Sequence, residues 1–174
     1  MDTLIYSILL AFVVSLVLGP IVIPLLHKLK FGQQVRDDGP KQHLKKSGTP
    51  TMGGIMMLLA MAVPLAVFCG GSMEFLFMAV VGTAGFGLIG FLDDFLKIRH
   101  KRSLGLRAYQ KIIGQLGVSL VLALWAYHEP LVGSTLYIPF FDVSWELGWF
   151  YVPFMVFVII AVVNSVNLTD GLDG

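Results

Sequence analysis

Residues 4–26 read LIYSILLAFVVSLVLGPIVIPLL, a run without a charged side chain. A helix needs about 20 apolar residues to cross the hydrocarbon core of a bilayer. The run is longer than the roughly 7–15 apolar residues of a secretory signal, and no basic residue precedes it, so we interpret it as a retained first span. This stretch decides the fold class, because it predicts a chain that folds within a membrane.

The whole chain has the composition of an integral membrane protein. Of its 174 residues, 56% are hydrophobic and 13% are charged, whereas soluble domains average roughly 45–50% and about 25%. We therefore predict an all-α integral membrane protein, a polytopic bundle of about five transmembrane helices forming one domain over residues 1–174. A short outer-face hairpin is expected within residues 129–147. The spans are predicted near residues 3–26, 53–70, 76–96, 112–128 and 148–166.

The cationic residues predict the orientation of these spans. All twelve Lys and Arg residues lie in two windows, 28–46 and 97–111. Cytoplasmic loops of membrane proteins are enriched in Lys and Arg. We therefore predict that loops 27–52 and 97–111 are cytosolic, that the N-terminus lies outside, and that the chemistry of the chain faces the cytosol.

The third predicted span ends in two adjacent carboxylates, Asp93 and Asp94, followed by Lys97. Neighbouring helical residues point about 100° apart, so the two acids share a site only beyond the helix end, or one binds a cation while the other reacts. Lys97 follows Asp93 by one helical turn, where it can pair with that acid or hold a phosphate. Two solvated acids at a helix end are the structural alternative.

A second polar group lies at the other end of the chain. Asn167, Asp170 and Asp173 recur at a spacing of three, which aligns them on one face if the segment is helical. An amide beside two carboxylates suits a hard, oxygen-ligated ion such as Mg²⁺, or the hydroxyls of a ribose. No His or Cys lies in this segment, which disfavours zinc.

The first basic loop combines His43, Lys46 and Thr51 with Gly53-Gly54. Lysine side chains and the free N–H groups of a helix start suit a phosphate-bearing ligand. The Gly-x-x-x-x-Gly-Lys-[Ser/Thr] order of a P-loop is absent. The alternative for this loop is a topology signal or a contact with anionic lipid.

Taken together, three motifs resemble the phospho-N-acetylmuramoyl-pentapeptide transferases, the MraY-type translocase I family within the polyprenyl-phosphate sugar-1-phosphate transferases. The resemblance covers essentially the whole chain. It implies a family of about twice this length with about ten spans, so we expect the chain to be a truncated N-terminal half, with a further metal-binding Asp beyond Gly174. The motifs are Gly39-Pro40-x-x-His43-x-x-Lys46-x-Gly48-Thr49-Pro50-Thr51-Met52-Gly53-Gly54, Asp93-Asp94-x-x-Lys97 and Asn167-Leu168-Thr169-Asp170-Gly171-Leu172-Asp173-Gly174.

The resemblance implies an enzyme of the bacterial cytoplasmic (inner) membrane. Such an enzyme transfers phospho-N-acetylmuramoyl-pentapeptide from UDP-N-acetylmuramoyl-pentapeptide to undecaprenyl phosphate with Mg²⁺, forming lipid I and UMP in peptidoglycan synthesis. Its expected partners are these two substrates and membrane lipids, with no nucleic acid, and a homodimer is left open.

The resemblance also implies roles for individual residues. Asp93 and Asp94 are expected to be catalytic and to bind Mg²⁺, with Asp93 as the base for the lipid phosphate and Asp94 at the diphosphate. An aspartyl-phosphate route through the same pair stays open. The residues expected to bind the substrate are His43, Lys46, Thr51, Lys97, Asn167, Asp170 and Asp173, the last on the uridine side.

Two other classes of protein compete with this interpretation. Acids inside a membrane often mark ion or proton pathways, but here they cluster at predicted inner span ends and none lies at a predicted midplane, which disfavours a transporter. A non-catalytic membrane scaffold would retain its function after Asp93→Asn.

Overall fold

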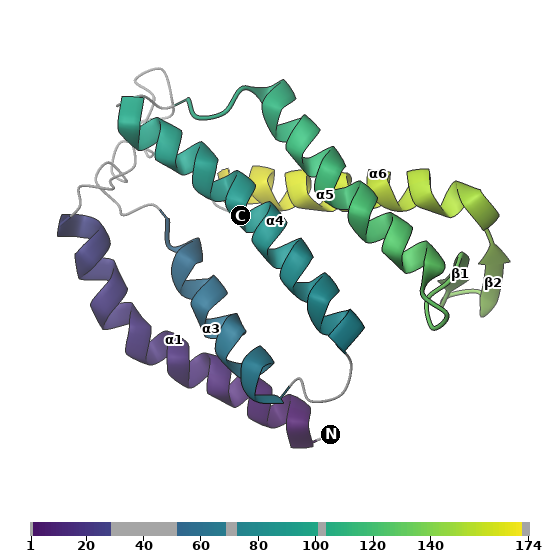
Figure 1. Ribbon diagram of the computed structural model, residues 1–174, viewed down its shortest axis with the longest axis horizontal. Helices are drawn as coiled ribbons and strands as arrows, with labels where there is room; N and C mark the ends of the chain where they lie inside the picture. Colours follow the sequence, from purple (N-terminus) through teal and green to yellow (C-terminus); the bar gives the residue numbers. More distant parts are fainter. Residues whose placement is uncertain (1, 29–51, 69–72, 101–103, 172–174) are drawn as a thin grey trace. The chain divides into compact units, whose positions relative to one another are not determined.

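The computed structural model describes residues 2–28, 52–68, 73–100 and 104–171. These residues form two compact units, Met1–Arg107 and Ala108–Gly174. The elements are α1 (Asp2–Lys28), α3 (Gly54–Phe68) and α4 (Met73–His100) in the first unit, and α5 (Ala108–His128), β1 (Thr135–Ile138), β2 (Val143–Glu146), a 3-10 turn (Gly148–Phe150) and α6 (Tyr151–Gly171) in the second (Figure 1).

In the part of the chain that the structure describes, four helical segments are long and apolar enough to cross a bilayer. They are α1, α4, α5 and Gly148–Thr169, whereas α3 is a shorter apolar helix of 15 residues. Large apolar side chains such as Phe12 and Phe157 lie 60% and 70% exposed on these helices. Such surfaces face lipid in a bilayer, where the helix satisfies its own backbone hydrogen bonds. The prediction of an all-α polytopic membrane protein is confirmed.

The helices on either side of the second basic loop extend further than their apolar stretches suggest. Helix α4 continues to His100, past residue 96, and α5 begins at Ala108, before residue 112. Backbone hydrogen bonding continues beyond the hydrocarbon edge, and cations are favourable in the last turn of a helix. Lys97 therefore lies on α4, where the helical spacing was expected to bring it close to Asp93.

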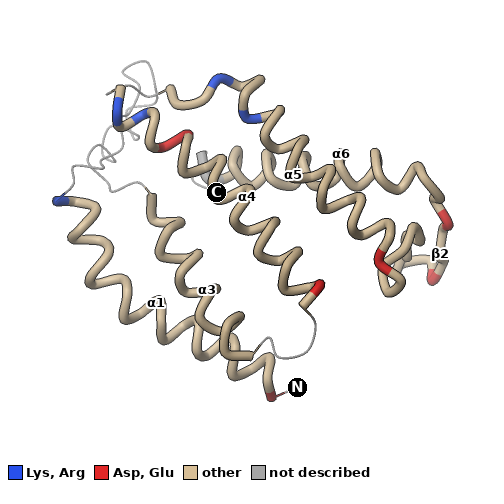
Figure 2. Tube along the Cα trace, viewed as in Figure 1, with Lys and Arg blue, Asp and Glu red and all other residues tan. Residues whose placement is uncertain are grey.

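The first unit segregates its charges. Helix α3 packs against α1 and α4 and runs opposite to both (Figure 1). The cationic ends of α1 and α4 consequently lie at the same end of this unit, and the acidic first turns of both helices lie at the other end (Figure 2). The carboxylates of Asp93 and Asp94 belong to the cationic end.

In the second unit a hairpin joins α5 to α6. Strand β1 pairs antiparallel with β2, from Thr135 opposite Glu146 to Ile138 opposite Val143. Asp142 has a φ of 51°, which Asp tolerates better than most residues. The hairpin expected within residues 129–147 is therefore present, and its position at the outer face stays a prediction.

A polar contact joins the first half of α5 to the second half of α6. Gln115 is buried, and its Oε1 accepts a hydrogen bond of 2.8 Å from Asn164 Nδ2. Gln115, Ser119 and Ala123 recur at a spacing of four and form the buried face of α5. Lipid tails are as apolar as Leu, so helix pairs in membranes rely on small residues and such hydrogen bonds.

Asn164→Ala should destabilise the second unit by about 1 kcal/mol, because it removes an interhelical hydrogen bond and leaves the buried Gln115 amide unpaired. The measurement is reversible unfolding of the intact protein in mixed micelles. Asn167→Ala is the matched control, an asparagine three positions later on the same helix. Equal stability of the two variants would contradict the prediction.

The hairpin should lose stability in acid. Hydrogen bonds from Ser134 and Thr135 lower the pKa of the Glu146 carboxyl below its usual value. A lowered folded-state pKa means that the carboxylate stabilises the hairpin above the unfolded pKa of about 4.3, and that this contribution is lost as the pH falls through the folded pKa.

The measurement is the hydrogen-exchange protection factor of the Leu147 amide, which donates to Ser134 O at 3.0 Å. Protection should be high at neutral pH and should fall below about pH 4. Glu146→Gln should lower the protection at pH 7 and flatten its pH dependence, and an unchanged profile in this variant would contradict the assignment.

Candidate functional site

One lysine joins the two adjacent carboxylates at the end of α4. Lys97 Nζ lies 2.7 Å from Asp93 Oδ2 and 3.0 Å from Asp94 Oδ1. Lys97 follows these residues by four and three positions, which are the two spacings that bring helical side chains together. The carboxylates leave the helix in different directions, and the shared ammonium group draws them into one cluster.

The two carboxylates differ in burial and in partners. The side chain of Asp93 is 9% exposed, whereas that of Asp94 is 30% exposed. A buried carboxylate is costly unless its oxygens are paired. Asp93 meets this need on both sides, because its Oδ1 accepts a hydrogen bond of 2.8 Å from the Leu106 N–H and its Oδ2 contacts Lys97. Asp93 is therefore held in place, and Asp94 is the more accessible of the two acids.

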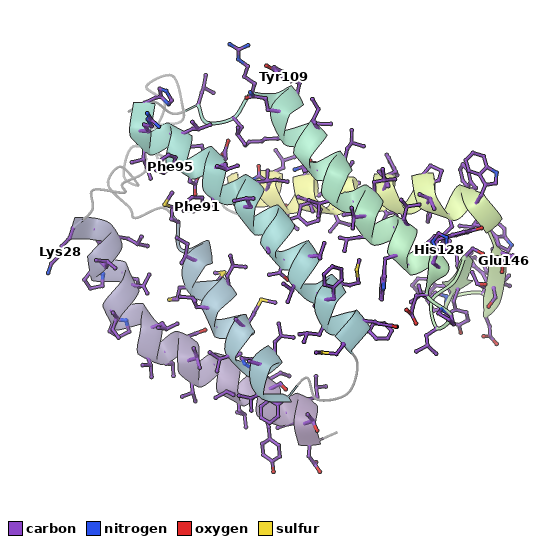
Figure 3. The ribbon with its side chains drawn as sticks, in the orientation of Figure 1. Lys28, Phe91, Phe95, Tyr109, His128 and Glu146 are labelled. Carbon is purple, nitrogen blue, oxygen red and sulfur yellow. The ribbon has the colours of Figure 1, made fainter. Side chains whose placement is uncertain are left out.

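The opposite face of α4 is aromatic. Phe91 and Phe95 stack with ring centroids 6.0 Å apart, and both are about 40% exposed (Figure 3). They flank Asp93 by two positions on either side, which is about 200° around a helix. Helix α4 thus presents an apolar face outward and turns Asp93 inward, toward the segment that follows the helix.

The backbone that contacts Asp93 was missed by sequence reasoning. Leu106 and its neighbour Gly105 fall within the predicted loop 97–111 and were not singled out, yet they lie directly against the carboxylate. The available signal was a glycine between Leu104 and Leu106, a small residue in a short connection. Spacing rules do not pair residues across such a connection, so the contact needed the structure.

Of the other candidate residues the structure describes only a part. Asn167 is exposed on α6, and Asp170 follows it on the same helix, three positions later. The side chain of Asp170 and the whole of His43, Lys46, Thr51 and Asp173 lie outside the described residues. Of the candidates that the structure describes, it brings together Asp93, Asp94 and Lys97.

The donor set at the end of α4 fits a magnesium ion that arrives with a phosphate ligand. Within residues 2–28, 52–68, 73–100 and 104–171, no three His, Cys, Asp or Glu side chains form a metal-binding group. Mg²⁺ usually takes one or two protein carboxylates and completes its octahedron with water and substrate phosphates. Asp93 and Asp94 can supply those two carboxylates.

Comparison with known proteins agrees with the motifs. The model of glycosyl transferase family 4 matches residues 76–174. A phospho-N-acetylmuramoyl-pentapeptide-transferase of Clostridium novyi is 50% identical over 174 residues, which are 100% of this chain and 54% of the relative. The corresponding proteins of Clostridium kluyveri and Clostridioides difficile are 51% and 52% identical, over 100% and 97% of this chain and 55% and 52% of their own lengths.

The chain spans about half the length of these curated relatives. The resemblance stated from three motifs is confirmed over the whole chain by these identities. Because the family match extends from α4 through α6, and so includes Asp93, Asp94, Lys97, Asn167 and Asp170, the chain belongs to glycosyl transferase family 4.

Proposed function

We propose that the intact protein transfers phospho-N-acetylmuramoyl-pentapeptide from UDP-N-acetylmuramoyl-pentapeptide to undecaprenyl phosphate, forming lipid I and UMP. The observation that carries the proposal is the contact of Lys97 with both Asp93 and Asp94 at the end of a membrane-spanning helix. The names of the relatives support the identity of the transferred group.

The position of the cluster suits this pair of substrates. A water-soluble nucleotide sugar and a lipid-linked phosphate can react only at a membrane boundary. The cluster belongs to the last turns of α4, next to Arg99 and His100. Lys and Arg are retained on the cytosolic side of membrane proteins. We therefore place the reaction at the cytosolic face of the bacterial inner membrane, with the N-terminus outside.

The reaction assigns different tasks to the three side chains. Asp93 Oδ2 would accept the proton of the lipid phosphate once the ammonium of Lys97 turns to the incoming phosphate oxygens. An oxygen of the deprotonated lipid phosphate then attacks the phosphorus that carries the sugar, and the bond from that phosphorus to UMP breaks. The Leu106 N–H keeps Asp93 Oδ1 in place throughout.

A covalent route through Asp93 is the alternative chemistry for the same residues. In that route the carboxylate itself attacks the phosphorus that carries the sugar, and UMP leaves. An oxygen of the lipid phosphate then attacks the same phosphorus, and the bond from that phosphorus to the Asp93 carboxylate breaks. Trapping of a phosphorylated protein with the nucleotide substrate alone would distinguish the covalent from the direct route.

Asp94 and Asp93 would also hold Mg²⁺, which neutralises the charge on the diphosphate oxygens when it is bound. The greater exposure of Asp94 supports its role at the diphosphate. On the nucleotide side we propose six further residues, supported by the three-residue spacing in the sequence after residue 166 and by the cations of the first loop. They are His43, Lys46, Thr51, Asn167, Asp170 and Asp173.

Asp93→Asn should lower kcat by about 100-fold or more, because the amide cannot accept the proton. The measurement is Mg²⁺-dependent UMP release by the intact protein in the presence of both substrates. Glu74→Gln is the matched control, an acid in the first turn of the same helix. Undiminished release by Asp93→Asn would remove Asp93 from the catalytic residues, and no release by the unaltered protein would overturn the proposed function and favour the scaffold.

Asp170→Ala should weaken binding of the nucleotide substrate by roughly 10-fold to 100-fold, which corresponds to the loss of a hydrogen bond to a charged group. Isothermal titration of the intact protein with UDP-N-acetylmuramoyl-pentapeptide measures the change. Leu168→Ala, which truncates an exposed side chain on the same helix, should bind like the unaltered protein. Equal affinities of the two variants would remove Asp170 from the nucleotide site.

A further inference from the structure

Residues 104–107, which precede α5, approach Asp93 more closely than any side chain at position 105 would allow. A Cβ on Gly105 would lie 2.4 Å from both the main-chain oxygen and Oδ1 of Asp93, and 2.8 Å from its Cγ. By contrast, a Cβ on Gly90, which lies three positions before Asp93 on α4, would meet nothing within 4 Å. The absence of a side chain is therefore required at Gly105 and is not required at Gly90.

This close approach produces the hydrogen bond to Asp93. The N–H that donates to Oδ1 at 2.8 Å belongs to Leu106, the residue next to Gly105. The nearest atoms to the hypothetical Cβ include main chain of α4, which cannot move aside as a flexible side chain could. A methyl group at position 105 would therefore push the segment outward and take the Leu106 N–H out of reach of the carboxylate.

We propose that Gly105 is a positioning residue for Asp93: its missing side chain lets the Leu106 N–H hold Oδ1, which directs Oδ2 toward Lys97 and the incoming phosphate. The proposal rests on the proposed function for what Asp93 does, but its geometric part does not. Gly105 acts through Asp93 and need not contact either substrate.

The reason that this positioning matters lies in the carboxylate torsion. Rotation about the Cβ–Cγ bond of Asp is broad, because it joins an sp³ and an sp² atom. Lys97 contacts Oδ2 of Asp93 and the Leu106 N–H binds Oδ1, so these two contacts together define the plane of the carboxylate. Displacement of a reacting group by about 1 Å can cost about 100-fold in rate. The effect should appear in kcat, because the substrate-binding side chains are unchanged.

The first test compares Gly105→Ala with Gly90→Ala in the intact protein. Gly105→Ala should lower kcat for UMP release at least about tenfold while KM for the nucleotide substrate stays within about twofold. Gly90→Ala should keep both constants, because its Cβ meets open space. If folded Gly105→Ala keeps the kcat of the unaltered protein, or loses activity only through KM, the positioning role is overturned.

The second test needs neither activity nor a folded Gly105 variant. Hydrogen exchange of the Leu106 amide is measured in Asp93→Ala and, as a control, in Asp94→Ala. Exchange should accelerate at least about tenfold in Asp93→Ala, which lacks the acceptor, and should stay within about twofold in Asp94→Ala. Equal exchange in the two variants would overturn the proposal even if Gly105→Ala fails to fold.

The two tests separate the failure of this inference from the failure of the proposed function. An unaltered protein that releases no UMP would refute the function and leave the exchange experiment to decide the geometry. An active protein whose Gly105→Ala variant keeps its kcat would refute the inference and leave the function standing.

Discussion

The ammonium group of Lys97 lies within 3.0 Å of carboxylate oxygens from both Asp93 and Asp94, and the rest of the candidate site depends on this contact. Ionised carboxylates at the edge of a membrane are costly unless they are paired. One cation shared by two acids pairs both carboxylates and holds them near each other. In the proposed reaction the same ammonium group turns to a phosphate. The group that pairs the two carboxylates before the substrate binds is thus also suited to phosphoryl transfer.

The two acids have become chemically different because their surroundings differ. Asp93 lies against the Gly105-Leu106 backbone and has a partner on each oxygen, whereas Asp94 is more exposed and contacts Lys97 through one oxygen. A fixed, buried carboxylate suits proton transfer or attack in a defined direction. An accessible carboxylate suits a metal that arrives with its substrate. This difference in burial supports the separate roles proposed for Asp93, as the base, and for Asp94, at the diphosphate.

The sequence predicted much of the fold because long apolar runs leave few alternatives in a bilayer. Each of the five predicted spans overlaps one α-helix. The hairpin between α5 and α6 was expected from its turn residues. Helix ends were harder to predict, since α4 runs on to His100 although its apolar stretch ends earlier. Hydrophobicity reports where the hydrocarbon core ends, and helical hydrogen bonding does not stop there.

By itself the sequence determined the membrane character, the charge partition and the spacing that brings Lys97 to its acids. The first two follow from where apolar and cationic residues lie along the chain, and the third depends on neighbours within one helix. Only the tertiary structure decided which acid is buried, that the Leu106 N–H binds Asp93, and that Gln115 meets Asn164. These contacts join residues 13 and 49 positions apart. No helical period relates them, because their separation depends on how the chain turns between helices and on how the helices pack.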